Sequence, residues 1–133
     1  MVDDAVVLDA VRAVLRERGE VVVPPAGFSM GGRYLRAEGL VLQPLRGPVR
    51  WGEVVAFTGE NRWVLHRVVA VRGDRVWTKG DALATLDDPP VARAALEARL
   101  VARIQGGRRC PETRWYAAWA LLRGGWHWLC RRR

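Results

Sequence analysis

The chain has 133 residues, of which half are apolar and 27% are charged, and its net charge at pH 7 is +8. This length and composition predict a single globular domain with a modest hydrophobic core. They argue against a transmembrane helix, because no apolar run reaches about 18 residues. The acidic start, with Asp3 and Asp4, also argues against a secretory signal peptide, which begins with a basic segment.

The two cysteines, Cys110 and Cys130, have neither the spacing of a zinc site nor that of a disulfide framework. A reducing compartment is the plainer explanation for such thiols. We therefore expect a cytoplasmic protein without a metal ion or another cofactor. Peripheral attachment to a membrane stays open as an alternative.

Apolar residues at near-helical spacing predict a helix over 3–18, and Gly19 follows its last residue. Residues 21–23 form a short predicted strand, which Pro24-Pro25 terminates. A glycine-rich turn follows over 27–32, where glycines permit backbone conformations that other residues resist.

The remaining pattern is that of β structure. Further strands are predicted at 40–43, 53–58, 62–71, 74–78 and 100–104. The segment 62–78 is expected to form a hairpin that turns at Gly73-Asp74. The sequence therefore predicts a mainly β protein with a helix at each end.

The basic charge is concentrated near the C-terminus. Residues 1–105 carry 15 Lys and Arg against 13 Asp and Glu, whereas residues 106–133 carry seven arginines against one glutamate. A stripe at helical spacing runs along this tail, formed by Trp115, Trp119, Leu122, Trp126 and Leu129. We therefore divide the chain into a β domain over 1–110 and a basic, tryptophan-rich helical tail over 111–133.

The tail has two plausible partners. Its helix can pack on the β domain of the same chain, or it can lie peripherally in a membrane interface. The residues that would contact a membrane are Trp115, Trp119, Trp126 and Arg131. Nucleic acid is not an expected partner, because no base-reading motif accompanies the arginines.

Three residues in the β domain suggest nucleophilic chemistry. Ser29 lies in the glycine-rich turn, His66 lies in a predicted strand, and Asp81 follows the hairpin. A serine hydroxyl is a poor nucleophile until a nearby base removes its proton. A histidine within reach would therefore make this domain a hydrolase, although each residue alone also suits a purely structural role.

Five segments in order resemble the signal peptidase I superfamily, which also contains the self-cleaving SOS-repressor peptidases. They are GFSM at 27–30, GLVLQPL at 39–45, WGEVVAF at 51–57, VLHRVVAVRGDRVWTKGDA at 64–82 and DDPPV at 87–91. The resemblance covers roughly residues 20–105. It implies a small coiled, β-barrel-like catalytic fold.

The resemblance also implies catalytic roles. Ser29 Oγ attacks a peptide carbonyl and His66 accepts its proton, as in the branch of the family in which histidine replaces lysine as the base. A carboxylate orients the imidazole, with Asp88 preferred and Asp87 as a close competitor. Asp81 is expected mainly to brace the loop, although it also lies near enough in sequence to reach the histidine.

Further expectations follow from the same resemblance. The backbone N–H of Ser29 is the expected oxyanion donor, and Phe28 and Met30 beside it are candidate substrate contacts. Lys79 corresponds to a basic residue of the family that is not the base. Substrates are expected to bind as an added extended strand, with small side chains in shallow pockets.

The sequence therefore favours a serine endopeptidase that cleaves a peptide or leader segment. A catalytically inactive peptide-binding module with a docking tail is the main alternative, because Gly31-Gly32 follows the serine where the family usually has a proline. A self-cleaving switch is a third possibility. It is less favoured, because no DNA-binding helix-turn-helix precedes Ser29.

Overall fold

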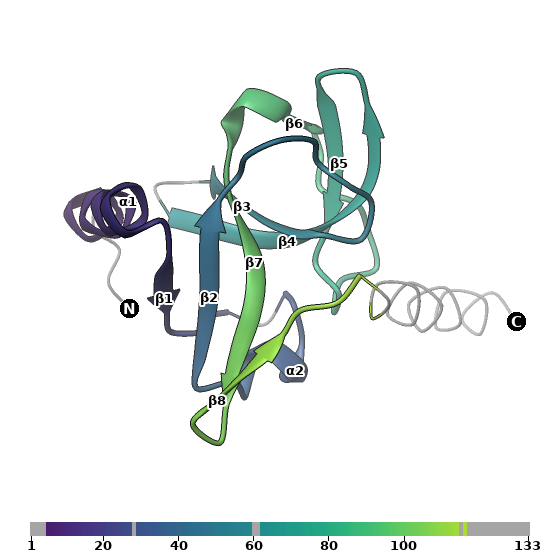
Figure 1. Cartoon of the computed structure of the whole chain (residues 1–133). Coiled ribbons are helices and arrows are strands. Elements are labelled where there is room, and N and C mark those ends of the chain that lie inside the picture. Colours follow the sequence, from purple (N-terminus) through teal and green to yellow (C-terminus); the bar gives the residue numbers. More distant parts are fainter. Residues whose placement is uncertain (1–4, 28, 60–61, 115, 117–133) are drawn as a thin grey trace, which may run out of the picture.

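The computed structural model describes residues 5–27, 29–59, 62–114 and 116 (Figure 1). The helices are α1 (Ala5–Arg18), α2 (Gly32–Leu35) and the 3₁₀ turn η1 (Arg93–Ala95). The strands are β1 (Val21–Val23), β2 (Gly39–Pro44), β3 (Val54–Gly59), β4 (Arg62–Arg72), β5 (Arg75–Lys79), β6 (Val91–Ala92), β7 (Leu96–Gln105) and β8 (Arg108–Pro111).

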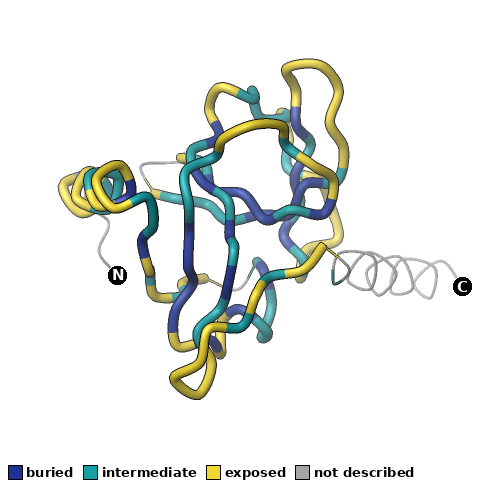
Figure 2. Tube along the Cα trace, viewed as in Figure 1, coloured by how far each residue is buried: buried dark blue, intermediate teal, exposed yellow. Residues whose placement is uncertain are grey.

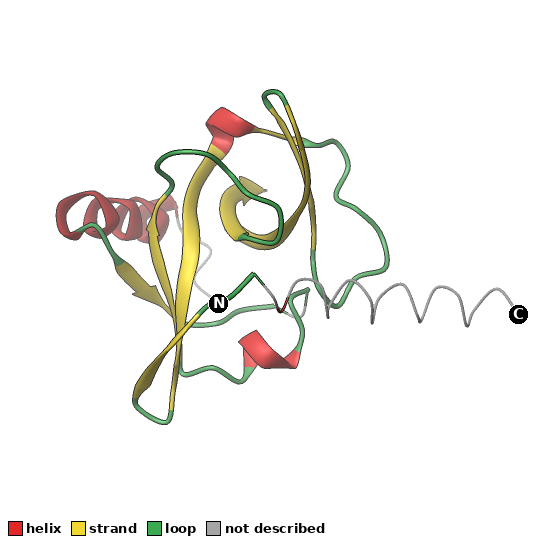
Figure 3. Ribbon diagram, turned by 45° about the vertical axis from the view of Figure 1, so that its right-hand side comes forward, coloured by secondary structure: helices red, strands yellow, loops and turns green. Residues whose placement is uncertain are grey.

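All eight described strands belong to one antiparallel sheet. Seven of them follow the order β1-β2-β7-β3-β4-β5-β6, and β8 pairs with β7 beside this path. The sheet curls, so that β4 runs across the direction of β2 and β7 in Figure 1 and the strands bend around the centre in Figure 3. The expectation of a mainly β fold is confirmed. The described sheet is open rather than closed, because its path ends at β1 and at β6.

The sheet is buried on both faces near its centre, where the long strands appear dark blue in Figure 2. In β3, Val54 and Ala56 belong to one hydrophobic cluster and Val55 to another. This division arises because successive side chains of a strand point to opposite faces. The first cluster packs between the sheet, α1 and α2, and it includes Leu15 and Tyr34.

Most predicted elements are present with shifted ends. The hairpin through Gly73-Asp74 is confirmed, since β4 and β5 pair up to Arg72 and Arg75. The strand predicted at 100–104 is longer, because β7 begins at Leu96. Its buried alternation includes Ala98 and Ala102, whose small side chains weaken the period-two signal.

Four short elements were not predicted, namely α2, β6, η1 and β8. Each has at most four residues, which is too short to show a helical or strand period. In addition, α2 begins immediately after Gly31, whose φ of 80° suits glycine.

The predicted boundary between residues 110 and 111 falls inside β8, and described residues of the predicted tail contact the β body. Strand β8 ends at Pro111, and Glu112 then accepts a hydrogen bond from the Tyr34 hydroxyl at 2.5 Å. The Arg114 guanidinium donates to the backbone oxygen of Trp51 at 2.8 Å, and the ring of Tyr116 packs edge-on against Tyr34. The β body therefore continues at least to Tyr116.

A polar cluster around Glu97 fastens α1 to the sheet. Glu97 of β7 accepts hydrogen bonds from Arg12 Nε of α1 at 2.6 Å, from Trp63 Nε1 of β4 at 2.7 Å and from Thr58 Oγ1 of β3 at 2.8 Å. Burial acts to raise the pKa of Glu97, but these three donors outweigh it and hold the pKa below its usual value. The charged form of Glu97 is therefore the one that the fold stabilises.

We predict that Glu97→Gln lowers the free energy of unfolding at pH 7 by about 1–2 kcal/mol. The folded-state pKa of Glu97 lies below its unfolded-state pKa of about 4.3. The stability that charged Glu97 contributes is therefore present above about pH 4.3 and is lost as pH falls through the folded-state pKa. Urea unfolding between pH 3 and pH 7 should therefore show the variant and the wild type converging at low pH. The control is Glu17→Gln, which changes an exposed glutamate of α1. An equal loss of unfolding free energy in both variants would contradict a stabilising role for Glu97.

Candidate active site

A cleft of about 720 Å³ opens beside the curled sheet. Most of its described lining comes from α1, from residues 23–27 at and after the end of β1, from the turn around Ser29, from α2 and from the first half of β4. The lining is mainly apolar, with a few polar groups among which are Ser29 and His66. A concave, mostly apolar cleft with a few polar groups is the usual form of a ligand site.

Ser29 and His66 both line this cleft. Ser29 is half-buried in the turn before α2, whereas His66 is buried in β4. The imidazole also makes an edge contact with the ring of Phe57, with the ring centres 6.2 Å apart. Among the described residues, the side-chain hydrogen bond of His66 is to Asp87, and none joins His66 to Ser29.

The carboxylate that contacts His66 is Asp87. Its Oδ2 atom lies 2.5 Å from His66 Nδ1 and accepts a hydrogen bond from Thr78 Oγ1 at 2.6 Å. The backbone N–H of Asp87 also donates to the carbonyl of Thr78 at 2.8 Å. Asp87 is therefore held against β5 by both its backbone and its side chain.

The preference for Asp88 is wrong in the described geometry. Asp88 is exposed, whereas Asp87 is half-buried against His66. The backbone hydrogen bond from Asp87 to Thr78 fixes Asp87 beside β5, where its side chain reaches His66. Spacing along the sequence does not reveal which of two adjacent carboxylates has this bond.

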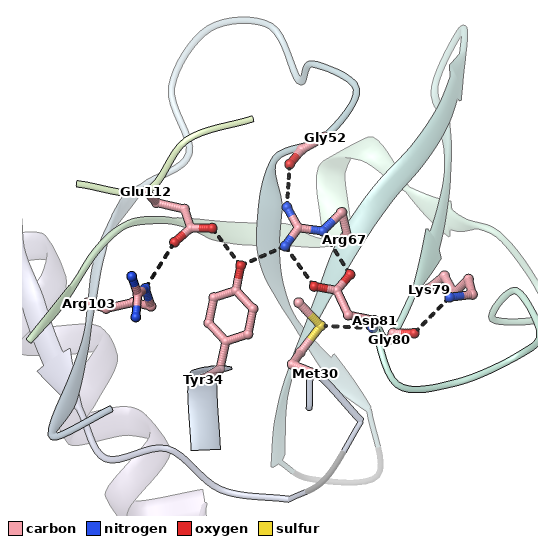
Figure 4. A network of polar contacts seen from close by, with 9 residues as sticks. All are labelled: Met30, Tyr34, Gly52, Arg67, Lys79, Gly80, Asp81, Arg103 and Glu112. Carbon is pink, nitrogen blue, oxygen red and sulfur yellow. Dashed lines mark hydrogen bonds and ion pairs between the residues drawn. The ribbon is translucent and has the colours of Figure 1, made fainter. Parts of the chain in front are cut away.

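Asp81 binds Arg67 rather than His66. Arg67 Nε and Nη2 donate to the two oxygens of Asp81 at 2.8 and 2.7 Å, which makes a bidentate ion pair. The remaining terminal nitrogen, Nη1, donates to the backbone oxygen of Gly52 at 2.8 Å (Figure 4). The expectation that Asp81 braces the loop agrees with this contact.

The ion pair extends into a wider network through Tyr34 (Figure 4). The Tyr34 hydroxyl accepts from Arg67 Nη2 at 2.6 Å and donates to Glu112, whose other oxygen lies 3.7 Å from Arg103 Nε. Burial raises the pKa of Tyr34 far above its usual value, so its hydroxyl stays protonated and able to donate. Tyr34 and Glu112 could not be predicted from the sequence, because Tyr34 lies in a four-residue helix and Glu112 lies 78 residues away, just after β8.

The segment 80–82 packs directly against the serine turn. The Ser29 carbonyl accepts a hydrogen bond from the Ala82 N–H at 2.8 Å, and the Asp81 N–H points at the Met30 sulfur 3.5 Å away. A Cβ atom on Gly80 would lie only 2.5 Å from the Ser29 carbonyl oxygen and 2.9 Å from Ser29 Cβ. The glycine of the Lys79-Gly80-Asp81 motif is therefore required by the close approach of two backbones.

The other sequence-predicted residues have mixed outcomes. Met30 is buried and lines the cleft, as expected for a substrate contact, whereas Phe28 lies outside the described residues. The tail residues proposed for membrane contact also lie outside them, namely Trp115, Trp119, Trp126 and Arg131. Lys79 is not part of the described cleft lining, and it donates to the Gly80 carbonyl at 3.2 Å. Burial lowers the pKa of Lys79.

Within the described residues, no group of three or more His, Cys, Asp or Glu side chains is arranged to hold a metal ion. None of the helices in that part of the chain is long and apolar enough to cross a membrane. Comparison of the chain with protein-family models, with curated proteins and with solved structures found no match.

We predict that Asp81→Ala lowers the free energy of unfolding by about 3–5 kcal/mol, because it leaves the guanidinium of Arg67 buried without its counter-charge. Only 1% of Arg67 is exposed, so water cannot replace the lost carboxylate. Asp74→Ala in the exposed β4–β5 turn is the matched control, with an expected loss below about 1 kcal/mol. Equal midpoints for the two variants in urea unfolding would refute a structural role for the ion pair.

Proposed function

We propose that the protein is a serine endopeptidase that resembles the signal peptidase I superfamily and cleaves a peptide or leader segment. The observation that carries the proposal is that Ser29 and His66 line one cleft, while Asp87 Oδ2 contacts Nδ1 of the His66 imidazole. This is the order of groups in a nucleophile, base and orienting acid.

The contact with Asp87 determines what His66 can do. A carboxylate accepts hydrogen bonds, so it favours the tautomer in which Nδ1 carries the proton. The Nε2 atom is then the basic nitrogen, available to take the proton of the Ser29 hydroxyl as it attacks a carbonyl. The carboxylate of Asp87 stabilises the imidazolium that forms, and the Thr78 hydroxyl holds that carboxylate in place.

Apart from one water molecule, the later steps need no group from outside the chain and its substrate. His66 returns the proton to the leaving amine, which departs and leaves an acyl group on Ser29 Oγ. A water molecule, deprotonated by the same histidine, then releases the acyl group and restores the serine. The backbone N–H of Ser29 is the proposed donor to the oxyanion in both halves of the reaction.

Two free strand edges beside the cleft support binding of a peptide in extended form. In the described sheet, β1 pairs with β2 alone, and residues 62–66 of β4 pair with β3 alone. The cleft lining includes residue 23 at the end of β1 and all of 62–66. An extended peptide placed there can form backbone hydrogen bonds with an existing strand.

A peptide-binding module without catalysis is the second candidate. One observation favours it, the lack of a hydrogen bond between Ser29 and His66 in the described residues. The cleft and its strand edges would then serve for binding alone. Cleavage assays on active-site variants separate the two candidates.

We predict that the wild type cleaves members of a peptide library and that Ser29→Ala and His66→Ala release no products detectable by mass spectrometry. Asp87→Asn should reduce kcat by about 10³–10⁴-fold, because an amide favours the wrong imidazole tautomer. Asp88→Asn, which changes the adjacent exposed carboxylate, is the matched control and should stay within about twofold of the wild type.

The pair of variants also tests the assignment of the acid. Equal losses in Asp87→Asn and Asp88→Asn would remove Asp87 from the mechanism. Products that persist in Ser29→Ala would exclude the serine mechanism. A folded wild type that binds peptides and cleaves none would establish the second candidate.

We further predict that Gly80→Ala lowers kcat strongly while the protein still folds, because the added methyl group displaces the serine turn. A shift of about 1 Å in a catalytic group costs about 100-fold in rate. Gly39→Ala is the control, since its Cβ would approach the side chains of Val22 and Ile104, at 2.7 and 3.6 Å, and neither residue is in the described cleft lining. The measurement is kcat together with the thermal midpoint, and an unchanged kcat in a folded Gly80→Ala protein would contradict the packing argument.

A further inference from the structure

The cleft reaches the hydrophobic core. Its lining includes Leu40, Val54 and Leu100, which are buried members of the main hydrophobic cluster. These side chains form its floor, because they belong to strands β2, β3 and β7 in the body of the sheet. A ligand that reaches this floor contacts the hydrophobic core itself.

Helix α1 forms a second apolar surface of the cleft. Val7, Leu8 and Val11 line it from the helix, and Trp63 and Leu65 line it from β4. The Glu97 cluster fixes both sides, because Glu97 binds Arg12 of α1 and the indole of Trp63. The distance between the two sides is therefore set by charged hydrogen bonds and not by the packing of the cleft lining alone.

Part of this apolar lining is exposed to solvent. Val7, Leu35 and Leu83 line the cleft and are 40%, 38% and 43% exposed. Exposed apolar side chains gathered at one concave site favour the binding of an apolar group that removes them from water.

From this lining we infer the substrate class: a peptide whose bound segment carries a bulky aliphatic or aromatic side chain that enters the space between α1 and β4. This inference rests on the proposed function. In an extended peptide every second side chain points to the same side, so at least one can face the floor. An alanine would leave the floor uncovered, whereas a leucine or phenylalanine would contact it.

The inference departs from the resemblance in one respect. The resemblance implies small side chains in shallow pockets, whereas this cleft has a volume of about 720 Å³ and reaches the core. Helix α1 is what makes it deep, since it supplies one complete side of the apolar lining.

The first test compares peptides that carry Ala, Leu or Phe at each of four positions on either side of the cut bond. We expect at least one position at which Leu or Phe raises kcat/KM by about tenfold or more over Ala, because each additional methylene in an apolar pocket contributes severalfold. Cleavage that is fastest with Ala at every position would overturn the inference and leave the peptidase proposal intact.

The second test uses two adjacent residues of α1. Val7→Glu places a carboxylate in the cleft lining, and Val6→Glu places the same charge on a neighbouring residue that is 76% exposed and outside the described lining. Val7→Glu should reduce the Leu-to-Ala ratio of kcat/KM by about tenfold, and Val6→Glu should leave it unchanged. An equal effect of both variants would point to long-range charge and would refute the role of the α1 surface.

A third test does not depend on cleavage. Ser29→Ala protein is titrated with fluorescein-labelled peptides of the Ala, Leu and Phe series, and affinity is read from fluorescence anisotropy. Tighter binding of the Leu and Phe peptides, lost in Ser29→Ala combined with Val7→Glu, supports the inference even if the wild type cuts nothing. Binding that does not distinguish the three peptides overturns it.

Discussion

The geometry of the site depends on one buried cation. Arg67 is almost completely removed from water, and a buried guanidinium is tolerated only when its N–H groups have acceptors. It finds them in Asp81 after β5, in the carbonyl of Gly52 before β3 and in the hydroxyl of Tyr34 in α2. Three segments that are distant in sequence are thereby held around one side chain. The serine turn lies next to two of them.

The same strand carries the proposed base, His66, on its other side. His66 and Arg67 are consecutive in β4, so their side chains leave opposite faces of the strand. The segment after β5 contacts residues on both faces of β4, because Asp81 binds Arg67 and Asp87 contacts His66. Asp81 forms a structural ion pair, and Asp87 is the proposed orienting acid. Between them, Gly80 and Ala82 lie against Ser29, which brings the proposed nucleophile to the same segment.

The sequence was informative where a motif or a period was strong. Ser29 in a glycine-rich turn, His66 in an apolar strand and the hairpin at Gly73-Asp74 could all be read from local pattern. The choice between Asp87 and Asp88 could not, because it depends on the backbone and side-chain hydrogen bonds between Asp87 and Thr78. The contact between Tyr34 and Glu112 joins elements 78 residues apart, and no local signal reports such a pair.

A second charged cluster gives the cleft a fixed width. Glu97 joins α1, β3 and β4, while Arg67 joins α2, β4 and the segment after β5. Strand β4 is common to both clusters, and its residues 62–66 line the cleft between them. Through these hydrogen bonds, α1 with its apolar surface and the segments beside the serine turn are both attached to β4. Under the proposed function, a peptide bound along β4 would therefore contact Ser29 and the apolar surface of α1 at a constant separation, as selection by a side chain distant from the cut bond requires.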